Sequence, residues 1–262
     1  SYSADIPSGT NTASANVNYY VFPSGDGLSI SGTNSDWYSV NLNNNGGSNY
    51  SYTVSSSYAS KADGSWSSTA TWMNGTIPDT SDDVIINHNI TLDQDDTIGS
   101  LTISGSSSLS LNSDNGLTIS GNLSNSGTVT ANSGSSLIVG GTSSGNINYN
   151  RNLGTTNWYM VSSPVTGQGI VDFYTNESPA LGSGTGDAQN VAIAPYDNSQ
   201  ATAADRWAYY TEGQVDGVGG DDTTDTFTSG TGYTVKMQAS GDIAFTGTMP
   251  VDNFTTLSLT DN

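Results

Sequence analysis

Residues 84–139 read VIINHNITLDQDDTIGSLTISGSSSLSLNSDNGLTISGNLSNSGTVTANSGSSLIV, a ladder of short apolar triplets. In each triplet two aliphatic residues flank a small or polar one, as in Leu101-Thr102-Ile103. Because residues i and i+2 of a β-strand point to the same face, each aliphatic pair marks the buried face of a short strand. Serine, glycine, asparagine and aspartate separate the triplets, which indicates frequent turns.

The triplets form two series that each recur with a period of about 20 residues, which is typical of a β-solenoid. The first series is Val84/Ile86, Leu101/Ile103, Leu117/Ile119 and Leu137/Val139, and the second is Ile90/Leu92, Leu109/Leu111 and Val129. Two series predict two strands in every coil, with Leu101, Leu117 and Leu137 in one stack. The predicted fold class is all-β: a right-handed parallel β-helix (β-solenoid) flanked by β-sandwich-like modules. For the ladder itself, a β-sandwich with closely spaced hairpins is the alternative.

Three parts are expected along the chain. Residues 1–60 form a small β module, interpreted as the tail of an upstream domain, with strand-like runs at 17–22, 28–31, 37–42 and 50–54. Residues 64–150 form the solenoid, and Trp66 and Trp72 are expected to cap its open end. An aromatic platform for a sugar ring is the alternative for these tryptophans. Residues 151–262 form a sandwich-like C-terminal module.

Charge and composition restrict the partners of this chain. The formal net charge is −20, and the cations are Lys61, Arg151, Arg206 and Lys236. A field of this sign repels phosphate backbones and anionic lipids, which excludes nucleic acid and disfavours sulfated or carboxylated glycans unless a metal ion bridges. There is no cysteine, and no apolar run reaches the roughly 20 residues of a membrane span. An acidic, soluble chain of this kind suits a secreted protein.

Catalytic residue types are sparse. His88 is the single histidine, no G-x-S-x-G motif surrounds a serine, and no lysine or arginine lies between Lys61 and Arg151 to act as the base of a lyase. The remaining catalytic possibility is a pair of acids on adjacent coils, drawn from Asp93, Asp95 and Asp96 with Asp79, Asp82 and Asp83. We therefore predict that the chain is not an enzyme.

Two acidic tracts are candidate calcium sites, because calcium prefers several oxygen ligands. They are Asp93, Asp95 and Asp96, and Asp216, Asp221, Asp222 and Asp225. Neither matches an EF-hand or a calcium-binding nonapeptide repeat, and a solvated acidic loop is the alternative for both. Aromatic pairs at 19–20, 37–38, 158–159 and 207–210 are candidate sugar-stacking faces, although strand alternation turns half of them inward.

A series of short motifs occurs in a defined order: Gly64-Ser65-Trp66, Ala70-Thr71-Trp72, Asp83-Val84-Ile85-Ile86, the Leu-x-Ile triplets, Asn157-Trp158-Tyr159, Ser163-Pro164-Val165, Ala194-Pro195-Tyr196, Gly230-Thr231-Gly232-Tyr233 and Phe245-Thr246-Gly247-Thr248. In this order they resemble a group of very large secreted, adhesin-like surface proteins of Bacteroidota exported by type IX secretion. The resemblance covers 64–262. It implies a cell-surface location and a piece of a longer polypeptide.

From these observations we expect a non-enzymatic, extracellular structural or adhesive segment, either a stalk or a filament-forming piece of a large surface protein. Its partners would be other copies or other modules of the same protein, or an extracellular polysaccharide. The alternative is a calcium-dependent carbohydrate-binding module, and the third hypothesis is a polysaccharide-degrading β-helix enzyme.

Overall fold

The computed structural model describes residues 16–19, 50–53, 58–218 and 220–251. The chain divides into two compact units, residues 1–57 and residues 58–262. In the first unit, β1 (Asn16–Tyr19) pairs antiparallel with β2 (Tyr50–Thr53). The strands expected at 28–31 and 37–42 lie outside the described residues.

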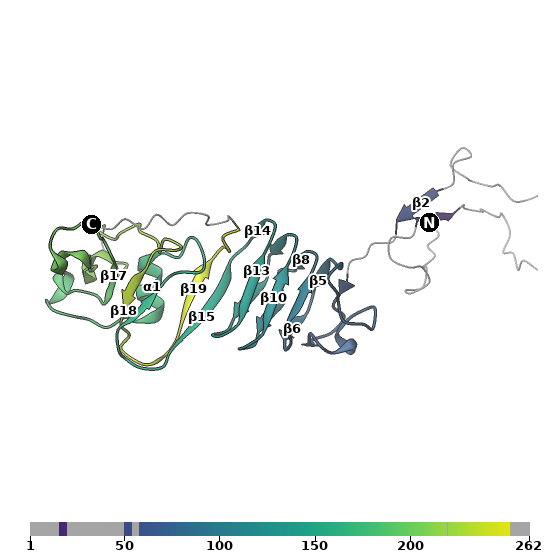
Figure 1. Cartoon of the computed structure of the whole chain (residues 1–262), viewed down its shortest axis with the longest axis horizontal. Coiled ribbons are helices and arrows are strands. Elements are labelled where there is room, and N and C mark those ends of the chain that lie inside the picture. Colours follow the sequence, from purple (N-terminus) through teal and green to yellow (C-terminus); the bar gives the residue numbers. More distant parts are fainter. Residues whose placement is uncertain (1–15, 20–49, 54–57, 219, 252–262) are drawn as a thin grey trace, which may run out of the picture. The chain divides into compact units, whose positions relative to one another are not determined.

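The second unit is built on a β-solenoid, in which successive coils stack strand on strand (Figure 1). Each complete coil contributes one strand to each of three sheets, and the described residues contain three complete coils. The first sheet has the order β3 (Tyr58–Ala59), β5 (Val84–Ile86), β8 (Leu101–Ile103), β11 (Leu123–Asn125) and β14 (Ser143–Ser144). The second has β4 (Gly64–Ser65), β6 (Asn89–Leu92), β9 (Ser108–Leu111), β12 (Thr128–Ala131) and β15 (Ile147–Leu153), and the third has β7 (Asp96–Ile98), β10 (Gly116–Ile119) and β13 (Ser136–Val139).

The strand registers confirm the β-solenoid and correct the number of strands in a coil. Val84 pairs with Leu101, which pairs with Leu123 in the next coil. Leu117 pairs with Leu137 in the third sheet. The expected single stack of Leu101, Leu117 and Leu137 is therefore wrong, because Leu101 belongs to another sheet. All three leucines nevertheless lie in one continuous hydrophobic core, so the coils share a common interior.

Aliphatic pairs predict only two strands per coil because polar residues replace aliphatic ones at two inward positions. Asp96 occupies the position that is leucine in the next two coils, and Asn125 occupies that of Ile103. Asn125 is buried, but its side chain accepts the N–H of Gly127 at 3.0 Å and donates to the carbonyl oxygen of Asn146 at 2.6 Å. A side-chain amide whose oxygen and nitrogen both form hydrogen bonds is tolerated inside the solenoid. Strand β11 therefore has no aliphatic pair in its sequence.

Two tryptophans close the N-terminal end of the solenoid. The 3-10 helix η3 (Thr69–Thr71) lies between Trp66 and Trp72, whose rings meet edge to face with centroids 4.9 Å apart. Both side chains are fully buried, and Trp72 Nε1 donates to the carbonyl oxygen of Trp66 at 2.8 Å. Both rings thus lie in the interior at the end of the solenoid where the sequence predicts a cap. A sugar platform at this pair is excluded, because neither ring is accessible.

At the other end the second sheet changes from parallel to antiparallel pairing. Strand β19 (Gly241–Gly247) returns from far along the chain and pairs antiparallel with all seven residues of β15. Beside β19 lie α1 (Ile170–Glu177) and a sheet with the order β16 (Tyr159–Val161), β18 (Tyr233–Val235) and β17 (Ile193–Pro195) (Figure 1). Short 3-10 helices complete this part: η4 (Gly186–Ala188), η5 (Ala203–Arg206) and η6 (Glu212–Gln214).

Aromatic packing joins these C-terminal elements to the solenoid. The ring of Phe173 on α1 lies 4.9 Å from that of Phe227 and 5.4 Å from that of Phe245 on β19, centroid to centroid. The described residues after Leu153 thus form a cap with one small sheet and one helix, instead of the two facing sheets of the expected sandwich-like module. Among the described residues, no helix is long and apolar enough to cross a membrane.

Candidate functional site

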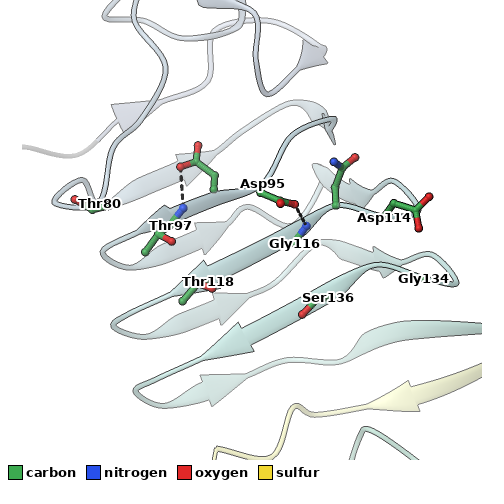
Figure 2. Close-up of a pocket in the computed structure, with 10 residues that line it drawn as sticks. Thr80, Asp95, Thr97, Asp114, Gly116, Thr118, Gly134 and Ser136 are labelled. Carbon is green, nitrogen blue, oxygen red and sulfur yellow. Dashed lines mark hydrogen bonds between the residues drawn. The ribbon is translucent and has the colours of Figure 1, made fainter.

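An open polar groove runs across the outer surface of the third sheet, over β7, β10 and β13 (Figure 2). Its volume is about 640 Å³. The lining consists of small, hydroxyl, amide and carboxylate residues, with neither an aromatic nor a basic side chain: Thr80, Asp95, Asp96, Thr97, Asp114, Asn115, Gly116, Thr118, Gly134 and Ser136.

Coil stacking arranges these residues in rows. Asp95 and Ser136 both lie beside Gly116 on neighbouring coils, and Asp95 Oδ1 accepts the N–H of Gly116 at 2.7 Å (Figure 2). Thr97 aligns with Thr118 on the next strand. Such rows offer hydrogen bonds to water or to a hydroxylated ligand, but they provide no surface on which a ring can stack.

The acidic tract that contributes to the groove also holds the N-terminal cap. Asp96 Oδ2 accepts the indole N–H of Trp66 at 2.6 Å, and its Oδ1 accepts the N–H of Thr97 at 2.8 Å. Asp93 accepts both the backbone N–H and the hydroxyl of Ser67, at 3.0 and 2.7 Å. A buried indole N–H needs an acceptor, which explains why a carboxylate stands at an inward position of the first coil.

The pKa of Asp93 reflects partial burial and the hydrogen bonds that its carboxylate accepts from Ser67. Partial burial opposes the charge of its carboxylate, but the hydrogen bonds from Ser67 outweigh that effect and hold the pKa below its ordinary value. Asp93 is therefore ionised at neutral pH and acts as an acceptor for the cap. A general acid, in contrast, needs a raised pKa.

The second acidic tract, 216–225, forms a loop whose carboxylates bond to the chain itself. Asp216 Oδ1 accepts the N–H of Val218 at 2.8 Å, and Asp222 Oδ1 accepts that of Gly217 at 3.0 Å. Asp225 Oδ2 accepts the phenol of Tyr210 at 3.0 Å. Burial, strengthened by this bond to Asp225, raises the pKa of Tyr210 well above its ordinary value.

The sequence-predicted metal ligands are thus not brought to a common point. In the part of the chain that the structure describes, no group of three or more histidine, aspartate or glutamate side chains is placed to hold a metal ion. Asp93 and Asp96 bond towards the N-terminal cap while Asp95 bonds towards the following coil. Asp221 is exposed on its loop.

The acids before the first coil close a turn. Asp79 accepts the backbone N–H and the hydroxyl of Ser81, at 2.9 and 2.7 Å, and Asp82 Oδ2 accepts the N–H of Asp79 at 2.8 Å. Burial raises the pKa of Asp82, the hydrogen bond from Asp79 opposes the rise, and the charges of Asp79 and Asp83 add to it. Asp83 accepts the N–H of Ser100 at 2.9 Å, which ties the turn to the first coil.

His88 has a partner that the sequence did not indicate. Its Nδ1 is 2.9 Å from Oγ of Ser60, a residue of the N-terminal coil, and that oxygen also accepts the N–H of Asn87 at 2.9 Å. A nucleophilic serine bonds Nε2 of its histidine and stands open to substrate, whereas Ser60 bonds Nδ1 and is buried. The pair joins two coils.

The aromatic pairs divide as strand alternation predicts, but the sequence could not assign the faces. In 158–159, Trp158 is half exposed and Tyr159 packs against the core. In 207–210, Tyr209 is exposed and Tyr210 is packed inward. Trp158 and Tyr209 meet across the surface, with centroids 5.8 Å apart. The pair at 37–38 lies outside the described residues, as does Tyr20.

Comparison with known proteins adds a family without an assigned activity. Residues 57–258 match the model of a domain of unknown function, DUF8693, and the chain belongs to that family. The match begins next to the first strand of the solenoid and includes both caps. No curated protein and no solved structure matches the chain.

Proposed function

We propose that this member of the DUF8693 family is a non-enzymatic spacer, a rigid structural or adhesive segment of an extracellular cell-surface protein that holds binding surfaces at a distance. The observation that carries the proposal is a solenoid whose coils stack without interruption between two caps. Backbone pairing and a continuous aliphatic core run from the tryptophan pair to β19. A stack of this kind resists bending, because each coil is bonded along its strands to both neighbours.

The two caps favour a spacer over a filament. Trp66 and Trp72 cover the first coil, and β19 pairs along the whole of β15. Unpaired strand edges are what recruit a second chain, and the longest strand of the last coil, β15, offers none because β19 covers it; of the described strands, only the short β13 and β14 end their sheets there. The net charge of −20 adds mutual repulsion between copies.

Extracellular location is part of the proposal and rests on the acidic, hydroxyl-rich surface, which keeps a chain soluble outside the cell. Serine, threonine and asparagine cover the outward positions of the coils, as in Ser108-Leu109-Ser110-Leu111, where both leucines are buried. A spacer needs only such a surface and a defined length.

Rigidity is tested with spin labels. The chain has no cysteine, so Met73→Cys and Met160→Cys, which are 60% and 64% exposed, introduce label sites at opposite ends of the solenoid without background. Pulsed electron resonance is expected to give one narrow distance distribution, and sedimentation is expected to show a monomer at every concentration. A broad distribution would contradict the spacer. Turnover of a polysaccharide that disappears in Asp95→Ala would show an enzyme instead.

A further inference from the structure

A second, smaller cleft lies beside the three-stranded sheet of the C-terminal cap, away from the polar groove. Its volume is about 250 Å³. Its walls combine aromatic, aliphatic and polar side chains, and its floor includes the buried residues Val191 and Ala192. The rest of the lining is Trp158, Ala180, Leu181, Gly182, Ser183, Asn190, Tyr209 and Lys236.

Two exposed rings form a corner of this cleft. Trp158 is 50% exposed and Tyr209 38% exposed, their planes are inclined by 64°, and their centroids lie 5.8 Å apart. Large aromatic side chains are usually buried to a large extent. An exposed apolar patch with a polar rim is typical of an interaction site. Because both rings are partly exposed and inclined to each other, one can stack on a ligand ring while the other bounds its side.

The cleft is small and partly polar, which restricts the ligand. A volume of about 250 Å³ lies just below the range of pockets for drug-sized ligands, so it accommodates about one ring. The hydroxyl of Ser183 and the amide of Asn190 supply donors and acceptors next to the rings. A sugar combines these needs, because its C–H face stacks on aromatics while its hydroxyl groups form hydrogen bonds.

Lys236 sets the charge of the ligand. It is half-buried, and its ammonium group forms no ion pair with any residue in the described part of the chain. An ammonium group is a charged donor, and a carboxylate is its strongest hydrogen-bonding partner. The cleft therefore favours a sugar that carries a carboxylate over a neutral one.

The net charge of −20 does not oppose a single acidic group. The described lining of the cleft contains no acidic residue, and at physiological salt charges beyond about 8 Å are largely screened. A long polyanion would lie along the acidic surface and be repelled. The ligand is thus the end of a glycan.

We propose that the cleft formed by Trp158, Tyr209 and Lys236 binds the terminal sugar of a glycan, with a preference for a uronic acid. This site gives the spacer an adhesive contact of its own, in the cap instead of on the coils. The inference does not depend on the spacer function. The spin-label distances test rigidity and the titration below tests sugar binding, so either proposal can fail while the other holds.

The test is a titration of the full chain, followed by NMR, with two matched oligosaccharides that end in glucuronic acid or in glucose. The glucuronic acid ligand is expected to shift the indole N–H signal of Trp158, which is assigned by its loss in Trp158→Phe. Trp158→Ala is expected to weaken binding about tenfold through the lost stacking surface. Lys236→Met is expected to weaken the acidic ligand about tenfold, to the level of the neutral one.

Matched controls separate the site from general effects. Tyr196→Ala removes another exposed ring of the same cap, and Lys61→Met removes a cation from the N-terminal coil. Both are expected to bind like the wild type. Equal affinity for the two oligosaccharides would overturn the assignment to a uronic acid. No shift of the Trp158 signal with either ligand, in a chain whose other signals show it folded, would overturn the site itself.

Discussion

The bond from Trp66 to Asp96 offers the sharpest test of how the solenoid is closed. In Asp96→Ala, the buried indole N–H loses its acceptor at 2.6 Å and the N–H of Thr97 loses its acceptor at 2.8 Å. A buried donor left without a partner costs about 1–3 kcal/mol. We expect Asp96→Ala to lower the free energy of unfolding by about 2 kcal/mol, which corresponds to a fall in Tm of about 4–8 °C for a chain of this size.

Two further variants make the measurement specific. Asp96→Asn keeps one acceptor oxygen but presents an N–H₂ group to the second donor, so its loss is expected to lie between those of the wild type and Asp96→Ala. Asp205→Ala removes an equally charged but exposed residue of the C-terminal cap and is expected to stay within about 0.5 kcal/mol of the wild type. Urea unfolding followed by tryptophan fluorescence measures all three.

The reasoning would be refuted by Asp96→Ala unfolding at the wild-type urea concentration with an unchanged slope. The carboxylate of Asp96 would then not stabilise the cap, and a role as a metal ligand or as a catalytic acid would be the better explanation for it. A loss as large in Asp205→Ala as in Asp96→Ala would mean that net charge, and not the cap, governs stability.

Three other predictions concern separate parts of the unit. Burial raises the pKa of Asp82, so its carboxyl group binds a proton more tightly in the folded chain than in the unfolded one, and stability falls as pH rises through the raised pKa. Asp82→Asn keeps an acceptor for the N–H of Asp79 and cannot ionise. It should therefore raise the urea midpoint at pH 7 and leave the midpoint unaltered near pH 3. Calcium or a chelator should not move Tm, because carboxylates of both acidic tracts already accept hydrogen bonds from the chain; a rise in Tm with calcium would show a site in one of them. Gly145→Ala should cost about 2 kcal/mol or more by thermal unfolding, since φ is +81° there and a Cβ would collide with the carbonyl oxygen of Asn125; wild-type Tm would show that the coil relaxes freely at this turn.

Much of the solenoid was predictable because aliphatic alternation is a local signal. Pairs such as Leu109/Leu111 have one environment, the interior, and their spacing reports the coil. The same signal predicted too few strands where a polar residue takes an inward position. Asp96 and Asn125 hold inward positions because each satisfies a buried donor or acceptor, so the third strand of the coil stayed hidden.

The candidate sites were less predictable, since they depend on contacts between distant residues. Ser60 meets His88 only through coil stacking, and Trp158 meets Tyr209 only through the cap. Neither contact leaves a spacing that a single sequence can reveal. Strand alternation did predict that one member of each aromatic pair faces outward, but not that two outward members share a cleft.

The most direct test of the spacer is the deletion of one whole coil, residues 101–122. Because Leu101 pairs with both Val84 and Leu123, the deletion sets Leu123 on Val84 and leaves both caps intact. With spin labels at Met73→Cys and Met160→Cys, we expect a folded chain whose narrow label distance is shorter by about 5 Å, the separation of neighbouring strands. An unfolded chain, or a distance that does not change, would contradict a rod whose length is set by its number of coils.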